Sequence, residues 1–100
     1  MRRIVFFILP LLLSSLQGAV AGGPHHITFA VGCYDVGAAA LENRPGVLQV
    51  GKNWQRYDVY KFREVNRVEY DPQRVTVKQL EQWLKQADTW RATLPDQRKE

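Results

Sequence analysis

The sequence has a single cysteine, a small net charge and no long uninterrupted apolar run. One cysteine, Cys33, excludes a disulfide within the chain. The apolar run over 4–13 contains Pro10 and is far shorter than the roughly 20 residues of a membrane-spanning helix. The net charge of +4 falls to +2 without Arg2 and Arg3. This charge is too small to favour a nucleic acid or a membrane surface as partner.

The first 21 residues have the three parts of an export signal. Arg2 and Arg3 form a positive start, residues 4–13 an apolar centre, and Ala19-Val20-Ala21 a cleavage site. We expect a soluble, periplasmic or secreted protein with no membrane attachment after cleavage. Its parts are expected to be a flexible arm at 22–26, one domain at 27–94 and a tail at 95–100.

The start of the domain predicts a strand followed by a short helix. Residues 27–31 are β-branched and aromatic, which is typical of a strand. We expect Asp35 to cap a helix over 36–43, which Pro45-Gly46 ends. This helix is expected to bury Val36, Ala39, Ala40 and Leu41.

Extended segments follow this helix. Residues 47–54 predict a strand with Leu48, Val50 and Trp54 on one face. Residues 57–62 and 64–70 together predict one long extended segment that ends at Asp71-Pro72. Strand alternation places four of its side chains on one side: Glu64, Asn66, Val68 and Tyr70.

The second helix has the clearest sequence signals. Thr76 and Gln79 form a capping box, and apolar residues then recur at helical spacing at Val77, Leu80, Trp83, Leu84 and Ala87. Residues 90–94 predict a closing edge strand. The order strand, helix, strand, strand, helix, strand predicts an α+β fold of the ferredoxin-like split βαβ type.

Cys33 lies where the first strand gives way to the first helix. The unpaired N–H groups and positive dipole end of a helix N-terminus favour the thiolate form of a cysteine, which is the nucleophilic form. The alternative interpretation is that Cys33 is a packed apolar side chain in a non-catalytic interaction domain.

Two blocks of sequence resemble the peptide methionine sulfoxide reductase A family. Thr28-Phe29-Ala30, Gly32-Cys33-Tyr34 and, further on, Pro45-Gly46-Val47 are similar to its T-F-A-x-G-C-F-W signature and the P-G-V that follows. The segment from Glu64-Val65 through Val68 to Tyr70-Asp71-Pro72 is similar to its H-x-E-x-V-x-x-x-Y-D-P segment. The two blocks cover most of residues 27–85.

This resemblance implies an active site without a metal or other cofactor. Cys33 would attack the sulfoxide sulfur and become a sulfenic acid, and Glu64 would help to protonate the departing oxygen. We expect Tyr34, Trp54 and Tyr60 to bind the substrate, a peptide that contains methionine sulfoxide.

The chain departs from the family pattern beside the cysteine. Asp35 stands where the signature has its second aromatic residue, so we expect an incomplete active site. A resolving cysteine is missing, which leaves the reduction of the sulfenic acid to an external thiol.

The chain also resembles heavy-metal-associated domains in its length and order of elements. Those domains place a C-x-x-C pair at this junction, and here Cys33 matches the second cysteine while Ala30 occupies the first position. This resemblance implies a module that binds a soft metal ion such as copper or mercury. We expect His25 and His26 to be a polar lead-in to the first strand; the alternative is that they join Cys33 in a metal site shared between two molecules. Cys33 could also link two copies in a dimer.

Overall fold

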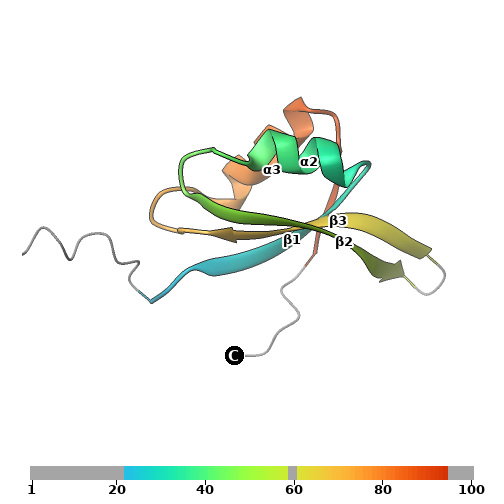
Figure 1. Cartoon of the computed structure of the whole chain (residues 1–100), viewed down its shortest axis with the longest axis horizontal. Helices are drawn as coiled ribbons and strands as arrows, with labels where there is room; N and C mark the ends of the chain where they lie inside the picture. Colours follow the sequence, from blue (N-terminus) through green and yellow to red (C-terminus); the bar gives the residue numbers. More distant parts are fainter. Residues whose placement is uncertain (1–21, 59–60, 95–100) are drawn as a thin grey trace, which may run out of the picture.

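The computed structural model describes residues 22–58 and 61–94, which form an antiparallel sheet with two helices on one of its faces (Figure 1). The order of elements is β1 (His25–Val31), α2 (Tyr34–Leu41), β2 (Val47–Asp58), β3 (Lys61–Tyr70), α3 (Val77–Gln86) and β4 (Trp90–Leu94). The four strands are arranged as β2-β3-β1-β4, and each neighbouring pair is antiparallel. The predicted α+β class is therefore confirmed.

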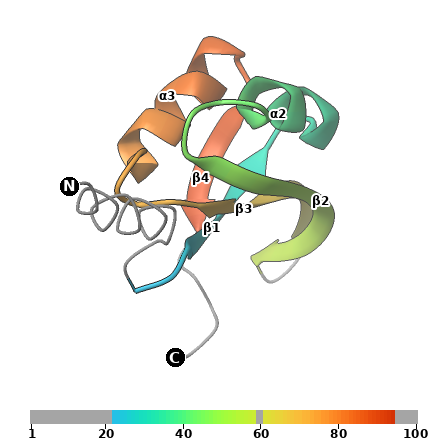
Figure 2. The same cartoon turned by 60° about the vertical axis from the view of Figure 1, so that its left-hand side comes forward.

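The core lies between the sheet and the helix layer. Both helices cover the same face (Figure 2). Alternate side chains of the central strands β1 and β3 point to that face and pack against leucines of the helices. The buried apolar cluster consists of Phe29, Val31, Leu41, Val68, Tyr70, Val75, Leu80 and Leu84.

The predicted start of the first helix is wrong, and its predicted buried face is right only in part. Helix α2 begins at Tyr34, its N-cap is Cys33, and Asp35 lies in its first turn. Its buried residues are Gly37, Ala38 and Leu41, whereas Val36 is 42% exposed. Ala39 is also exposed, and Ala40 is half-buried. Leu41 is buried as predicted, and Gly37 and Ala38 are buried beside it because α2 approaches Asn66 of β3 closely at Gly37.

The predicted long extended segment over 57–70 is also wrong, because the chain reverses within it. Strands β2 and β3 pair from Val47↔Tyr70 to Asp58↔Lys61 and so form a hairpin. In β2, a register shift between Val47 and Gln49 leaves Leu48 outside the regular alternation and 48% exposed. Val50 packs against the core as expected.

The second half of the domain agrees with the sequence. Thr76 is the N-cap of α3, and its hydroxyl accepts a hydrogen bond of 3.1 Å from Gln79 N. Leu80 and Leu84 are fully buried beneath the helix. Strand β4 closes the sheet beside β1, at the residues predicted for it.

The predicted export signal and tail, residues 1–21 and 95–100, lie outside the described residues. Within 22–58 and 61–94, neither helix has the length and apolar character needed to cross a membrane.

Candidate active site

Cys33 lies at a corner where β1 ends and α2 begins. Its backbone is extended, with φ −147° and ψ 123°, and it occupies the N-cap position of α2. The cysteine side chain makes no capping hydrogen bond and is half-buried. An N-cap side chain ordinarily accepts a hydrogen bond from the first turn. The thiol does not perform this role, so another group must.

That group is the carboxylate of Glu64 on β3. Its Oε1 accepts a hydrogen bond of 2.7 Å from the backbone N–H of Tyr34, the residue after Cys33. A carboxylate at this place satisfies an orphan donor of the helix and interacts favourably with the helix dipole. Strand alternation correctly predicted that Glu64 faces the helices together with Val68 and Tyr70. The hydrogen bond stabilises the start of α2 and also holds the carboxylate beside the cysteine.

Two predicted substrate-binding residues meet at the same corner. Trp54 pairs with Glu64 across β2 and β3, and its ring stands edge-on to Tyr34 with 6.3 Å between ring centroids. Trp54 is 55% exposed.

Phe62, which sequence reasoning missed, pairs with Arg56 one step further along the hairpin and is 59% exposed. Phe62 lies two residues before Glu64 on the same strand, so strand alternation could have placed both side chains on one face.

Asp35, in the first turn of α2, forms an ion pair. Its Oδ1 accepts a hydrogen bond of 2.9 Å from Lys52 Nζ on β2. This hydrogen bond and the charge of Asp35 raise the pKa of the Lys52 ammonium above its ordinary value of 10.5. Both side chains are exposed. The ion pair thus links the first turn of α2 to β2 at the exposed edge of the corner.

Asn66 is a buried part of the corner that sequence reasoning did not assign to the site. Its Nδ2 donates hydrogen bonds to the backbone carbonyls of Tyr34, at 3.1 Å, and Gly51, at 3.2 Å. The side chain is fully buried beneath Gly37 of α2. Asn66 therefore links the first turn of α2 to β2.

The other predicted site residues are not brought to this corner. Tyr60 lies outside the described residues. His25 and His26 lie at the start of β1, and the strand separates them from Cys33 by about 20 Å. Among residues 22–58 and 61–94, no group of three or more His, Cys, Asp and Glu side chains is placed to hold a metal ion.

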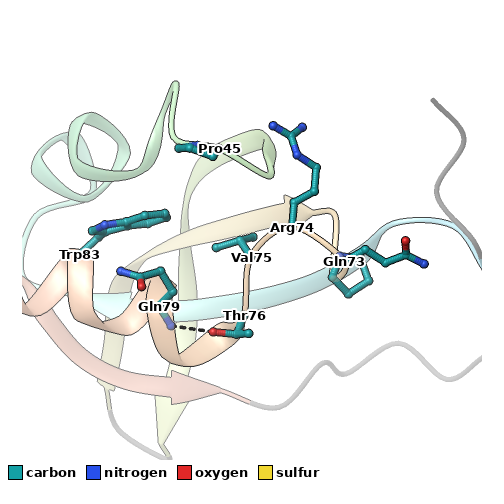
Figure 3. Close-up of a pocket in the computed structure, with 8 residues that line it drawn as sticks. Pro45, Gln73, Arg74, Val75, Thr76, Gln79 and Trp83 are labelled. Atoms are coloured by element: carbon teal, nitrogen blue, oxygen red, sulfur yellow. Dashed lines mark hydrogen bonds between the residues drawn. The ribbon is translucent and has the colours of Figure 1, made fainter. Parts of the chain in front are cut away.

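A separate hollow of about 410 Å³ lies at the other end of α2 (Figure 3). It is lined by side chains from the loop before β2, the loop before α3 and α3 itself, among them Pro45, Val75 and Trp83. The guanidinium of Arg44 stacks over Trp83, 4.7 Å from the ring centroid. None of the predicted site residues lines this hollow.

Comparisons with protein-family models, with curated proteins and with solved structures find no match to this chain.

Proposed function

We propose that this protein is an exported, thiol-dependent reductase of methionine sulfoxide in peptides, similar to the peptide methionine sulfoxide reductase A family. Cys33 is the nucleophile, Glu64 is the proton donor, and Tyr34 and Trp54 bind the methyl group of the substrate. We also propose a ferredoxin-like split βαβ fold. The order β-α-β-β-α-β, the strand order β2-β3-β1-β4 and the two helices on one face support it.

One observation carries the functional proposal, the hydrogen bond between Tyr34 N and Glu64 Oε1. The two residues are 30 positions apart in the sequence. The family resemblance matches the cysteine and the glutamate in separate blocks, and an active site requires that their side chains come together. A general acid must lie within reach of the group that it protonates. The hydrogen bond holds the carboxyl group next to the residue that carries the thiol.

The proposed reaction transfers two electrons from one sulfur atom to another. The thiolate of Cys33 attacks the sulfoxide sulfur and forms a sulfur–sulfur bond, while the protonated sulfoxide oxygen leaves as water. Water then attacks the cysteine sulfur, which breaks the sulfur–sulfur bond, releases the thioether and a proton, and leaves a sulfenic acid on Cys33. The substrate sulfur is reduced by two electrons to a thioether, and the cysteine sulfur is oxidised by two electrons to a sulfenic acid. Glu64 delivers a proton to the departing oxygen and recovers one from solvent.

An external thiol completes the cycle. A first thiol displaces water from the sulfenic acid and forms a mixed disulfide with Cys33. A second thiol attacks this disulfide, which releases the free cysteine and a disulfide of the reductant. The chain has one cysteine, so both reducing thiols come from another molecule.

The test is turnover of a methionine sulfoxide peptide with dithiothreitol as reductant. We expect turnover by the wild type, none by Cys33→Ser, and a fall of about 10²-fold or more in kcat for Glu64→Gln. The amide oxygen of glutamine can still accept from Tyr34 N, so α2 keeps its cap while the acid is lost. Glu69→Gln, the same change on the same strand but on the opposite face, is the matched control and should keep full activity.

The proposal is wrong if the wild type shows no turnover with dithiothreitol or with a protein thiol reductant, or if Cys33→Ser turns over as fast as the wild type. Equal activity of Glu64→Gln and Glu69→Gln would restrict Glu64 to its capping role.

A further inference from the structure

The backbone around Cys33 is held by a residue that the proposed reaction does not use. Thr89 lies between α3 and β4, and it is 3% exposed. Its hydroxyl accepts a hydrogen bond of 3.1 Å from Cys33 N, and the same hydroxyl donates to Cys33 O at 3.4 Å. Its carbonyl accepts a further hydrogen bond of 2.8 Å from Gly32 N. One threonine thus binds both backbone groups of the cysteine.

Thr89 is itself held in place. Its N–H donates to the carbonyl of Leu84 in the last turn of α3, at 3.0 Å. Leu84 is fully buried in the core. Asp88, directly before Thr89, has a left-handed φ of 59°, which turns the chain from the helix toward β4. Cys33 is therefore linked through Thr89 to the C-terminal end of α3.

The next residue along the chain is held in the same way from the opposite side. The N–H of Tyr34 donates to Glu64, and its carbonyl accepts from Asn66, both on β3. The peptide groups on either side of the Cys33 Cα are thus fixed by Thr89 and by β3. A fixed backbone sets the direction of the Cα–Cβ bond, and with it the volume that the sulfur can occupy.

The geometry points to Thr89 as a positioning residue: its hydroxyl orients Cys33 so that the thiol meets the substrate beside Glu64. This inference rests on the proposed function, in which Cys33 is the nucleophile. A reacting group that is displaced by about 1 Å loses roughly 10²-fold in rate, because the reaction needs a narrow range of approach. Thr89 reaches the reaction only through Cys33, so removal of its hydroxyl changes the chemical step rather than substrate binding.

The variants are Thr89→Val, which removes the hydroxyl, and Thr89→Ser, which keeps it. Thr76→Val is the control, because it removes an exposed capping hydroxyl at the start of α3, away from Cys33. We expect Thr89→Val to lower kcat at least tenfold while KM changes less than threefold. Thr89→Ser should recover kcat to within threefold of the wild type, and Thr76→Val should keep the wild-type kcat under conditions where it is folded.

A second measurement does not depend on activity. Hydrogen exchange of the Cys33 amide, followed by NMR, should be at least tenfold faster in Thr89→Val than in the wild type and unchanged in Thr89→Ser and Thr76→Val. Absence of turnover in the wild type would refute the proposed reductase, whereas the exchange rates would still decide the role of Thr89. Equal exchange of Cys33 in wild type and Thr89→Val, or equal kcat in Thr89→Val and Thr76→Val, overturns the inference.

Discussion

Gly37 provides the sharpest test of how α2 is seated on the sheet. Replacement of a glycine in the interior of a helix by alanine ordinarily stabilises a protein by about 0.5–1 kcal/mol. At Gly37 the added methyl group would overlap Oδ1 of Asn66 and would lie 3.0 Å from its Cγ and 3.5 Å from Leu84 Cδ2. Asn66 is fully buried and its Nδ2 donates to two backbone carbonyls, so its side chain cannot move aside without weakening these hydrogen bonds. We therefore expect Gly37→Ala to destabilise the protein.

The expected loss follows from what Asn66 must give up. Overpacking of a buried site costs about 1–3 kcal/mol. Movement of Asn66 also weakens its hydrogen bonds to Tyr34 O and Gly51 O, each worth about 1 kcal/mol. After the helix-propensity gain is set against these terms, the free energy of unfolding should fall by about 2–4 kcal/mol. For a domain of this size the melting temperature should drop by more than about 10 °C.

Urea unfolding followed by circular dichroism measures this change. Ala39→Gly, at an exposed position of the same helix, gives the size of the propensity term and should cost about 1 kcal/mol. The double variant Gly37→Ala/Asn66→Ala should lose less unfolding free energy than the sum of the losses in the two single variants. The difference should be at least about 1 kcal/mol, because alanine at position 66 makes room for the added methyl group. A Gly37→Ala protein as stable as the wild type would refute this packing of α2 against Asn66.

Two further predictions concern titration. Asp35→Asn should lower the pKa of Lys52 toward 10.5, because the negative charge that raises it is lost and only a neutral hydrogen-bond acceptor remains. NMR titration of the Lys52 Cε signal measures this pKa, and an unchanged value would contradict the ion pair. Burial raises the pKa of Tyr70 above its ordinary value of 10.0, so the folded state favours the neutral phenol. The contribution of the neutral Tyr70 phenol to the free energy of unfolding is present below pH 10 and is lost as the pH rises through the raised pKa. Urea unfolding at pH 8 and pH 11 should therefore show a smaller loss of stability at high pH for Tyr70→Phe than for the wild type, and equal losses would contradict this.

The sequence predicted those parts of the fold that depend on neighbouring residues. Thr76 and Gln79 lie in one turn and mark the start of α3 without help from the rest of the chain. Strand alternation also predicted the common side of Glu64 and Val68, because the side-chain period of a strand is local. These signals need no knowledge of what packs against them.

The parts that the sequence did not predict depend on distant residues or on weak turn chemistry. Helix α2 begins at Tyr34, and the group that caps its first turn is Glu64 on β3. Local sequence signals contain no trace of this distant cap, so they predicted Asp35 as the cap instead. The turn between the two successive strands was predicted at the wrong place because residues 58–61 contain neither the glycine nor the asparagine that favours a tight turn. The contact between Thr89 and Cys33 was not predicted because the two residues are 56 positions apart in the sequence.

The position of Thr89 in the chain bears on the order in which the thiol corner is built. Strand β1 comes first in the described sequence, yet its neighbours in the sheet are β3 and β4, which come much later. Contacts between such distant residues require closure of the whole intervening loop and form slowly. During synthesis, Cys33 is made long before the threonine that orients it. The backbone of Cys33 is therefore fully held only after Thr89 and β4, the last of the described elements, have joined the sheet.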